Sequence, residues 1–116
     1  VELIRMRAAD IVNIKLMKTG GISNAIKIAD ICSLYGMDCM IGCMLESSIG
    51  VAAAVHLAVA KSDVISKVDL DGPSLSQYDP VTSGVLFNES EISVTNAPGL
   101  GIRHIDGLMP ANNLAA

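Results

Sequence analysis

Residues 10–21 read DIVNIKLMKTGG, and this stretch decides the fold that the rest of the chain completes. Its first half predicts a strand over residues 11–16, because side chains alternate along a strand and one face would carry Val12, Ile14 and Leu16. The two glycines that follow predict a turn, and a helical pattern begins after them. An apolar strand face is typical of a sheet that helices cover on that side.

Lys15 is the first candidate functional residue, because it ends the polar face of this strand just before the glycine turn. Parallel α/β folds place their binding and catalytic groups at the carboxyl ends of the strands. A plainer interpretation is a strand-end lysine whose ammonium group lies in solvent. Taken alone, the residue pattern favours the plainer interpretation.

Strands and helices continue to alternate along the first 73 residues. The patterns predict helices over residues 1–9, from Ser23 or Asn24 to Tyr35-Gly36 and from Ser47 or Ser48 to Lys61, and strands over 38–44 and 67–71. Consecutive strand–helix units imply parallel strands with right-handed crossovers. The fold class is therefore α/β, and the pattern fits either an open doubly wound sheet or part of a (β/α) barrel.

The pattern changes after Gly72-Pro73, where the alternation of strands and helices stops. Residues 84–87 (GVLF) and 91–94 (EISV) flank the short polar stretch 88–90 (NES), which predicts a hairpin. Residues 97–102 predict a loop that contains a proline and two glycines. We expect the terminal run 110–116 to fray.

The composition excludes several classes of protein. Hydrophobic residues make up 51% of the 116 residues and charged residues 17%, which argues against a disordered chain. A formal charge of -4 without a basic cluster argues against nucleic acid as a partner. No apolar run reaches the roughly 18–20 residues of a membrane span, and the charged opening of the chain does not resemble a signal peptide. We therefore expect a cytoplasmic protein.

The cysteines and the central histidine do not predict a metal site. Cys32, Cys39 and Cys43 stand at spacings that match no familiar zinc pattern, so we interpret them as buried, reduced thiols. His56 falls inside the helix that ends near Lys61, without a second ligand at metal spacing. A packing role is the simpler interpretation of this histidine.

Four segments resemble a known family in the correct order. Residues 13–22 (NIKLMKTGGI), 41–46 (IGCMLE) and 69–73 (DLDGP) are similar to motifs of the sixth, seventh and eighth strands of the enolase superfamily, in its muconate-lactonizing subgroup. Residues 98–102 (PGLGI) resemble the C-terminal ending of that family. The closest likeness is to dipeptide epimerases of the L-Ala-D/L-Glu epimerase type.

The resemblance implies a fold and a division of the chain. Residues 1–73 would form the last three βα units of a (β/α)8, TIM-type barrel, and residues 74–116 an appendage that returns to the capping domain. Because the first residues already read as helix, we expect a C-terminal part of a longer enzyme. Barrel strands with open edges promote association, so we also expect a homo-oligomer.

The resemblance also implies a chemistry, an isomerase that removes the proton α to a carboxylate and forms an enolate. Lys15 would be the catalytic base, with Lys18 a weaker candidate. Asp69 and Asp71 would bind the α-ammonium group of a dipeptide, and Cys43 would line the substrate site mainly through its backbone, at a position where the family often has serine. Mg²⁺ would be the cofactor of the whole enzyme, held by carboxylates on earlier strands that this chain does not contain.

Two alternatives remain beside the epimerase interpretation. A cycloisomerase or o-succinylbenzoate synthase of the same superfamily would keep the lysine but needs no ammonium clamp. A non-catalytic α/β module would have inherited the motifs without the activity. We expect residues 1–116 alone to be inactive, because they supply one face of the site and no metal ligands.

Overall fold

The structure is a computed structural model that describes residues 1–108, so the predicted fraying of residues 110–116 falls outside the described residues. The helices in this part are α1 (Glu2–Arg5), α2 (Leu16–Thr19), α3 (Ile22–Leu34), α4 (Ser48–Ala60) and the 3₁₀ helix η1 (Gly72–Leu75). The strands are β1 (Ile11–Lys15), β2 (Asp38–Gly42), β3 (Ile65–Asp69), β4 (Val81–Ser83), β5 (Val85–Asn88), β6 (Glu91–Val94) and β7 (Ile102–Ile105).

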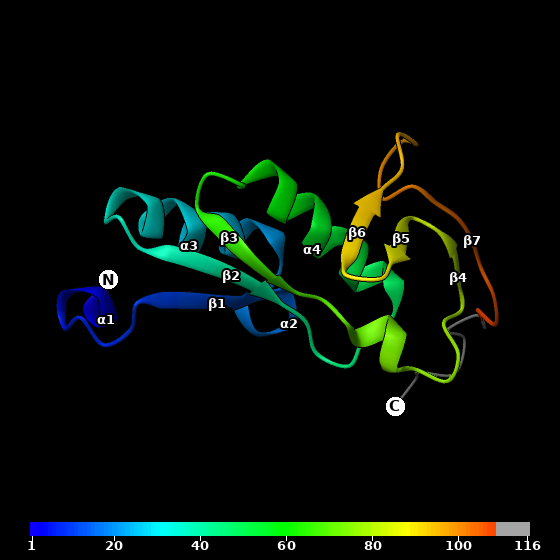
Figure 1. Ribbon diagram of the computed structural model, residues 1–116, viewed down its shortest axis with the longest axis horizontal. Coiled ribbons are helices and arrows are strands. Elements are labelled where there is room, and N and C mark those ends of the chain that lie inside the picture. Colours follow the sequence, from blue (N-terminus) through cyan, green and yellow to red (C-terminus); the bar gives the residue numbers. More distant parts are fainter. Residues whose placement is uncertain (109–116) are drawn as a thin grey trace, which may run out of the picture.

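A three-stranded parallel sheet in the order β1-β2-β3 organises the first part of the chain. The long helices α3 and α4 follow β1 and β2 and lie beside each other over the sheet (Figure 1). Ile14 and Ile41 project from the sheet into the core and are fully buried there. The helices contribute mostly small residues to this core, including Ala25 and Ala52, which lets them pack closely against the strands. The predicted α/β class is confirmed.

The glycine turn after β1 sets where α3 begins. Gly20 and Gly21 have φ values of +81° and +100°, a region that glycine enters without strain. Gly21 is the N-cap residue of α3, so the predicted cap at Ser23 or Asn24 is wrong. The Asn24 side chain instead donates a hydrogen bond back to the carbonyl of Thr19 at 3.0 Å. The predicted end of this helix at Tyr35-Gly36 is confirmed.

Four predicted boundaries need correction. The strands predicted over residues 11–16 and 38–44 end earlier, at Lys15 and Gly42. The first helix ends at Arg5, and Arg7 has a φ of +50° that is incompatible with a helix over residues 1–9. The third strand covers Ile65–Asp69 rather than 67–71, because Asp71 already belongs to the turn that starts η1. Since this 3₁₀ helix follows β3, the described chain holds two complete strand–helix units and a third strand, rather than three units.

The C-terminal part forms two small antiparallel ladders. The predicted hairpin is confirmed, and it consists of β5 and β6 with Glu89 at a φ of +53° in the turn. The pairing of β4 with β7 was not predicted from the sequence. The chain after Arg103 carries no clear pattern, yet His104 pairs with Thr82 in this ladder. The hairpin packs against α4, which joins this part to the helical layer (Figure 1).

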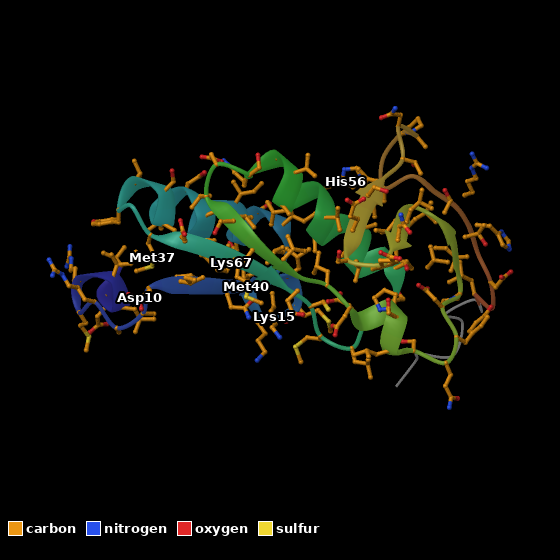
Figure 2. The ribbon with its side chains drawn as sticks, in the orientation of Figure 1. Asp10, Lys15, Met37, Met40, His56 and Lys67 are labelled. Atoms are coloured by element: carbon orange, nitrogen blue, oxygen red, sulfur yellow. The ribbon has the colours of Figure 1, made fainter. Side chains whose placement is uncertain are left out.

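The three cysteines are buried and the central histidine is half-buried. Cys32, Cys39 and Cys43 are free and buried, as predicted. Burial and the neighbouring Cys32 thiol raise the pKa of Cys39 to about 12. His56 lies half-buried on α4 (Figure 2), with an Nε2 atom that finds no hydrogen-bond partner among residues 1–108. Within the same residues, every helix is too short or too polar to cross a membrane.

Asp79 links the C-terminal part to the start of α4. Its Oδ2 atom accepts hydrogen bonds from the backbone N–H of Ser48, at 3.1 Å, and from the Ser48 hydroxyl. Its Oδ1 atom accepts from the N–H of Val81 at 3.2 Å. Ser47 is the N-cap residue but makes no capping bond with its side chain. A carboxylate at a helix N-terminus satisfies free N–H groups and interacts favourably with the helix dipole, so Asp79 supplies the cap that the local sequence does not.

We predict that Asp79→Ala lowers the free energy of unfolding by about 1–2 kcal/mol, the usual cost of losing an N-terminal helix cap. Asp79→Asn should lose less, because an amide oxygen can still accept the bond from Ser48. Urea denaturation of the two variants measures the difference, with the exposed Asp10→Ala as the matched control. An Asp79→Ala variant as stable as the control would contradict this capping role.

Candidate functional site

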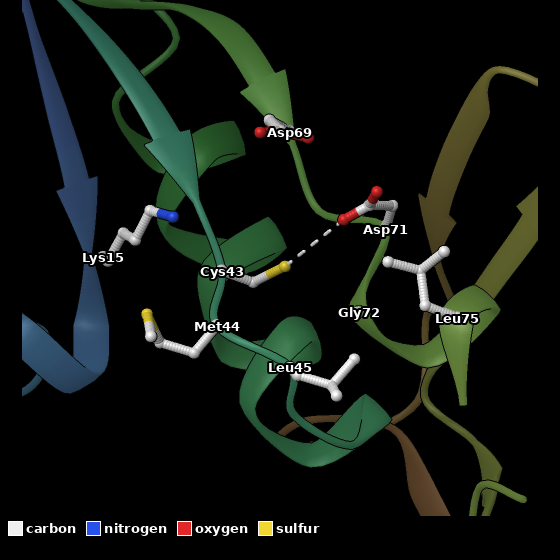
Figure 3. A pocket seen from close by; sticks show the side chains of 8 residues that line it. All are labelled: Lys15, Cys43, Met44, Leu45, Asp69, Asp71, Gly72 and Leu75. Carbon is white, nitrogen blue, oxygen red and sulfur yellow. Dashed lines mark hydrogen bonds between the residues drawn. The ribbon is translucent and has the colours of Figure 1, made fainter. Parts of the chain in front are cut away.

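A cavity of about 320 Å³ opens at the carboxyl ends of the three parallel strands. Its wall comes from the ends of β1 and β3, the loop between β2 and α4, and η1 (Figure 3). The lining residues are Lys15, Cys43, Met44, Leu45, Asp69, Asp71, Gly72 and Leu75. All four residues singled out from the sequence, Lys15, Cys43, Asp69 and Asp71, therefore lie at one cavity, while their chemical roles stay a prediction.

Lys15 reaches the cavity because its neighbour across the sheet has no side chain. Lys15 pairs with Gly42 on β2, and Gly42 pairs with Asp69 on β3. A Cβ atom built on Gly42 would lie 2.7 Å from Oδ1 of Asn13 and 3.0 Å from Cε of Lys15. The side chains of Asn13 and Lys15 thus occupy the space over this glycine. Lys18, the weaker candidate, is exposed on α2 and does not line the cavity.

The two aspartates come from different local structures. Asp69 ends β3, whereas Asp71 is the N-cap residue of η1, and its carbonyl accepts hydrogen bonds from the N–H groups of Ser74 and Leu75. Leu70 between them is buried and fixes the chain to the core. Two exposed carboxylates two residues apart make this side of the cavity acidic, with the Lys15 ammonium on the other side (Figure 3).

Cys43 lies between the lysine and the aspartates, and its side chain takes part in the site. The thiol donates a weak hydrogen bond to Oδ1 of Asp71 at 3.9 Å (Figure 3). Burial raises the pKa of the Cys43 thiol, and the carboxylates of Asp71 and Glu46 act in the same direction, against the N–H of Gly72. The thiol therefore stays protonated near neutral pH and can donate. The prediction that Cys43 contributes mainly through its backbone did not foresee this side-chain contact.

Gly72 holds the two loops of the cavity wall together. A Cβ atom built on it would lie 2.9 Å from the carbonyl oxygen of Met44 and 3.2 Å from the backbone nitrogen of Glu46. Only a glycine permits this approach of η1 to the loop after β2. The Glu46 carboxylate closes the same loop by accepting the N–H of Met44 at 3.1 Å. The cavity wall is thus built from backbone contacts as well as from side chains.

Sequence reasoning missed the apolar part of the cavity, formed by Met44, Leu45 and Leu75. Met44 and Leu45 lie inside the motif at residues 41–46, but exposed apolar side chains in loops show no periodicity that marks them as part of a site. Gly42 carried a usable signal, since a glycine inside an apolar strand marks a close approach of neighbouring groups.

The described residues do not form a metal site. No group of three or more His, Cys, Asp or Glu side chains within residues 1–108 is arranged to hold a metal ion. The two aspartates of the cavity face a lysine and a thiol instead. A Mg²⁺ ion, which takes near-octahedral oxygen ligands, does not fit the donor set that these residues provide.

A lysine at the end of β1 lies opposite two carboxylates at the end of β3, with β2 between them. This arrangement defines an α/β protein whose site lies at the carboxyl ends of parallel strands, where barrel enzymes have theirs. The profile of one family, described as Enolase C-terminal domain-like, matches residues 1–106. The chain belongs to this family.

Similar proteins include several epimerases. The chain is 54% identical over 105 residues to an L-Ala-D/L-Glu epimerase from Clostridium acetobutylicum. It is 41% identical, with a TM-score of 0.85, to the substrate-liganded L-Ala-D/L-Glu epimerase structure from Bacillus subtilis. It is 46% identical, with a TM-score of 0.80, to the dipeptide epimerase from Enterococcus faecalis V583 complexed with Mg and the dipeptide L-Leu-L-Tyr.

These similarities cover most of the chain and a minor part of each relative. The matches include 90% of the chain for the first two proteins and 89% for the third. The chain spans only 29% of the length of each of the three.

We predict that Gly42→Ala disturbs the site more than the fold. The added methyl group would overlap the Asn13 amide and touch the Lys15 side chain, so the flexible lysine must move away. Any proton transfer by Lys15 in the whole protein should slow by about 10²-fold, the cost of a misplacement of roughly 1 Å. Solvent deuterium incorporation measures the rate, and circular dichroism checks the fold. An unchanged rate would show that Gly42 does not set the lysine position.

Proposed function

We propose that this chain is the C-terminal part of a dipeptide epimerase, an isomerase that inverts the α-carbon of one residue of a dipeptide. The observation that carries the proposal is the convergence of Lys15, Asp69 and Asp71 on one cavity. The activities of the similar epimerases from three bacterial species support it. The whole protein, rather than residues 1–116 alone, would catalyse the reaction.

Lys15 is the proposed base on one face of the substrate. Its neutral amine takes the proton from the α-carbon of the C-terminal residue, and its ammonium form returns a proton to the same face in the reverse direction. The Lys15 side chain reaches into the cavity because Gly42, its neighbour on β2, has no side chain that would fill the space there. Inversion also needs an acid–base group on the opposite face, which other parts of the protein would supply.

Asp69 and Asp71 are the proposed binding site for the α-ammonium group of the dipeptide. Two carboxylates on one side of the cavity complement a single cationic group through charge-assisted hydrogen bonds. The Cys43 thiol supports this role, because it donates its hydrogen bond to Oδ1 of Asp71 and leaves Oδ2 to accept one from the substrate. With the ammonium held at this end, the C-terminal residue of the dipeptide extends toward Lys15.

The rest of the enzyme follows from the family. In this proposal residues 1–73 hold the last three strands of a (β/α)8 barrel, with α3 and α4 after the first two strands and η1 after the third. Residues 74–116 would return to the capping domain. Mg²⁺ is the proposed cofactor of the whole protein, held by residues outside this chain, and the similar structure from Enterococcus faecalis V583 is complexed with Mg. The enzyme is cytoplasmic and homo-oligomeric, with a small-molecule substrate.

The alternative is a cycloisomerase or o-succinylbenzoate synthase of the same superfamily. The aspartate pair argues against it, because the substrates of those reactions carry no ammonium group that would complement two neighbouring carboxylates. A non-catalytic module is the further alternative. The open cavity with a lysine reaching over a bare glycine argues for chemistry there.

We predict that Asp69→Asn in the whole protein weakens the use of free dipeptides by about 1.5–3 kcal/mol, the worth of a hydrogen bond to a charged group. An N-acylated dipeptide lacks the ammonium charge, so its turnover should fall little or even rise. Steady-state kinetics on the two substrates measures the difference, with the exposed Asp10→Asn as the matched control. Equal losses on free and N-acylated dipeptides would show that the pair is structural and that the clamp is wrong.

A further inference from the structure

Asn13 lies two residues before Lys15 on β1, on the same face of the sheet. Because side chains alternate along a strand, the fully buried Ile14 between them points into the core, and Asn13 and Lys15 project from the opposite face. The cavity wall includes Lys15 but not Asn13. The Asn13 amide is therefore a neighbour of the proposed base, outside the space where a substrate would bind.

The Asn13 amide and the Lys15 side chain meet in the space that Gly42 leaves open. A Cβ atom built on Gly42 would lie 2.7 Å from Oδ1 and 3.4 Å from Nδ2 of Asn13, and 3.0 Å from Cε of Lys15. Carbon atoms in contact are normally about 3.5–4.0 Å apart, so these groups already fill the space over the glycine. The position of the amide therefore limits where the lysine side chain can go.

Packing, rather than an ion pair, holds the Lys15 side chain within residues 1–108. The ion pairs of this part of the chain join Lys61 to Asp30 and His104 to Asp106. A lysine side chain has four rotatable carbon–carbon bonds and much rotamer freedom, so an unsupported one occupies many conformations. Figure 3 shows Lys15 extended from the end of β1 toward β2, and the filled space over Gly42 accounts for this conformation.

From these contacts we propose that Asn13 is a positioning residue for Lys15, because its amide fills the space over Gly42 and keeps the lysine extended into the cavity. The inference rests on the proposed function, since it takes Lys15 to be the base on one face of the substrate. A base takes a proton only from a narrow range of distances and angles. Without the amide, the flexible lysine could fold back over Gly42 and away from the substrate.

The volume of the amide, rather than its polarity, carries this role. The part of Lys15 that meets the space over Gly42 is the carbon atom Cε, which forms no ordinary hydrogen bond with an amide. Leucine branches at Cγ as asparagine does and has nearly the same shape. Asn13→Leu should therefore keep the support of the lysine, whereas Asn13→Ala removes it.

Asn13→Ala and Gly42→Ala should be coupled, because both changes act on the same space. In Gly42→Ala alone, the new methyl group overlaps the amide oxygen of Asn13 and touches Lys15. When Asn13 is also alanine, this overlap is gone and the methyl group fills part of the hollow. The double variant should therefore lose less activity than the product of the two single losses, as neighbouring residues often do.

The test measures α-proton exchange in D₂O by ¹H NMR on the full-length protein, with L-Ala-L-Glu and L-Ala-D-Glu as separate substrates. Asn13→Ala should slow exchange by about tenfold to 10²-fold for the epimer whose proton faces Lys15, the cost of a misplacement of up to roughly 1 Å. Exchange of the other epimer should stay at the wild-type rate, because it depends on a group on the opposite face. A partly unfolded protein would lose both rates equally, so the two epimers separate a positioning role from a structural one.

The matched control is Asn88→Ala, which truncates an exposed asparagine of the β5–β6 hairpin that does not line the cavity. It should leave the exchange of both epimers unchanged, and Asn13→Leu should restore most of the rate that Asn13→Ala loses. If Asn13→Ala does not fold, Asn13→Ser takes its place with the same expected results.

Four results would each overturn this inference while the proposed function stands. They are a wild-type rate of Asn13→Ala for both epimers, equal losses for both epimers, an Asn13→Leu variant as slow as Asn13→Ala, and a double variant with Gly42→Ala that loses the full product of the single losses. Lys15→Ala distinguishes the two proposals. If it exchanged both epimers at wild-type rates, the proposed function would be wrong, and this inference with it.

Discussion

The register of three parallel strands is the constraint on which the site depends. Lys15, Gly42 and Asp69 lie side by side across β1, β2 and β3. Because the middle position is a glycine, the lysine extends over it toward the aspartate side. A shift of one residue in any strand would send its side chain to the opposite face of the sheet and separate the charged groups. The buried Ile14 and Ile41, one position before Lys15 and Gly42, hold this register through the core.

The loops after these strands fix the shape of the cavity wall. Gly72 brings η1 against the loop after β2, and the Cys43 thiol joins that loop to the Asp71 carboxylate. Asp79 then binds the N-terminus of α4, the helix that this loop leads into. The C-terminal part of the chain therefore supports the wall of the cavity from outside, although none of its strands lines the cavity. Packing of backbone on backbone makes this wall sensitive to single methyl groups.

Local patterns in the sequence predicted the elements that show an alternation, a turn or a stop signal in consecutive residues. The alternation around Ile14, the glycine stop at Gly36 and the polar turn of the β5–β6 hairpin each indicated the correct element. The pairing of β4 with β7 escaped prediction, because its partners lie far apart in the sequence and each strand is only three or four residues long. The Asp79 cap is equally distant from the helix that it stabilises, and no local pattern reveals it.

The candidate site was predicted through motifs rather than through periodicity. The charged residues and Leu45 stand in recognisable segments, but no pattern in the sequence marks Leu45 and Leu75 as neighbours until the structure places them at one cavity. Asp71 lines the cavity together with Asp69 but belongs to another element than predicted, because the strand ends at Asp69, two residues before the predicted end. A single sequence therefore does not reveal those side chains of a site that come together only through the fold.

The central claim is that Lys15 is the base on one face of the substrate. The most direct measurement is ¹H NMR of the full-length protein with each epimer of a dipeptide substrate in D₂O, comparing wild type, Lys15→Ala and Lys18→Ala. We predict that Lys15→Ala slows α-proton exchange by about 10²–10⁴-fold for the epimer whose proton faces this lysine, because this is the usual contribution of a general base. The control variant Lys18→Ala should exchange the α-protons of both epimers at the wild-type rate. If Lys15→Ala exchanged the α-protons of both epimers at wild-type rates, Lys15 would not be the base.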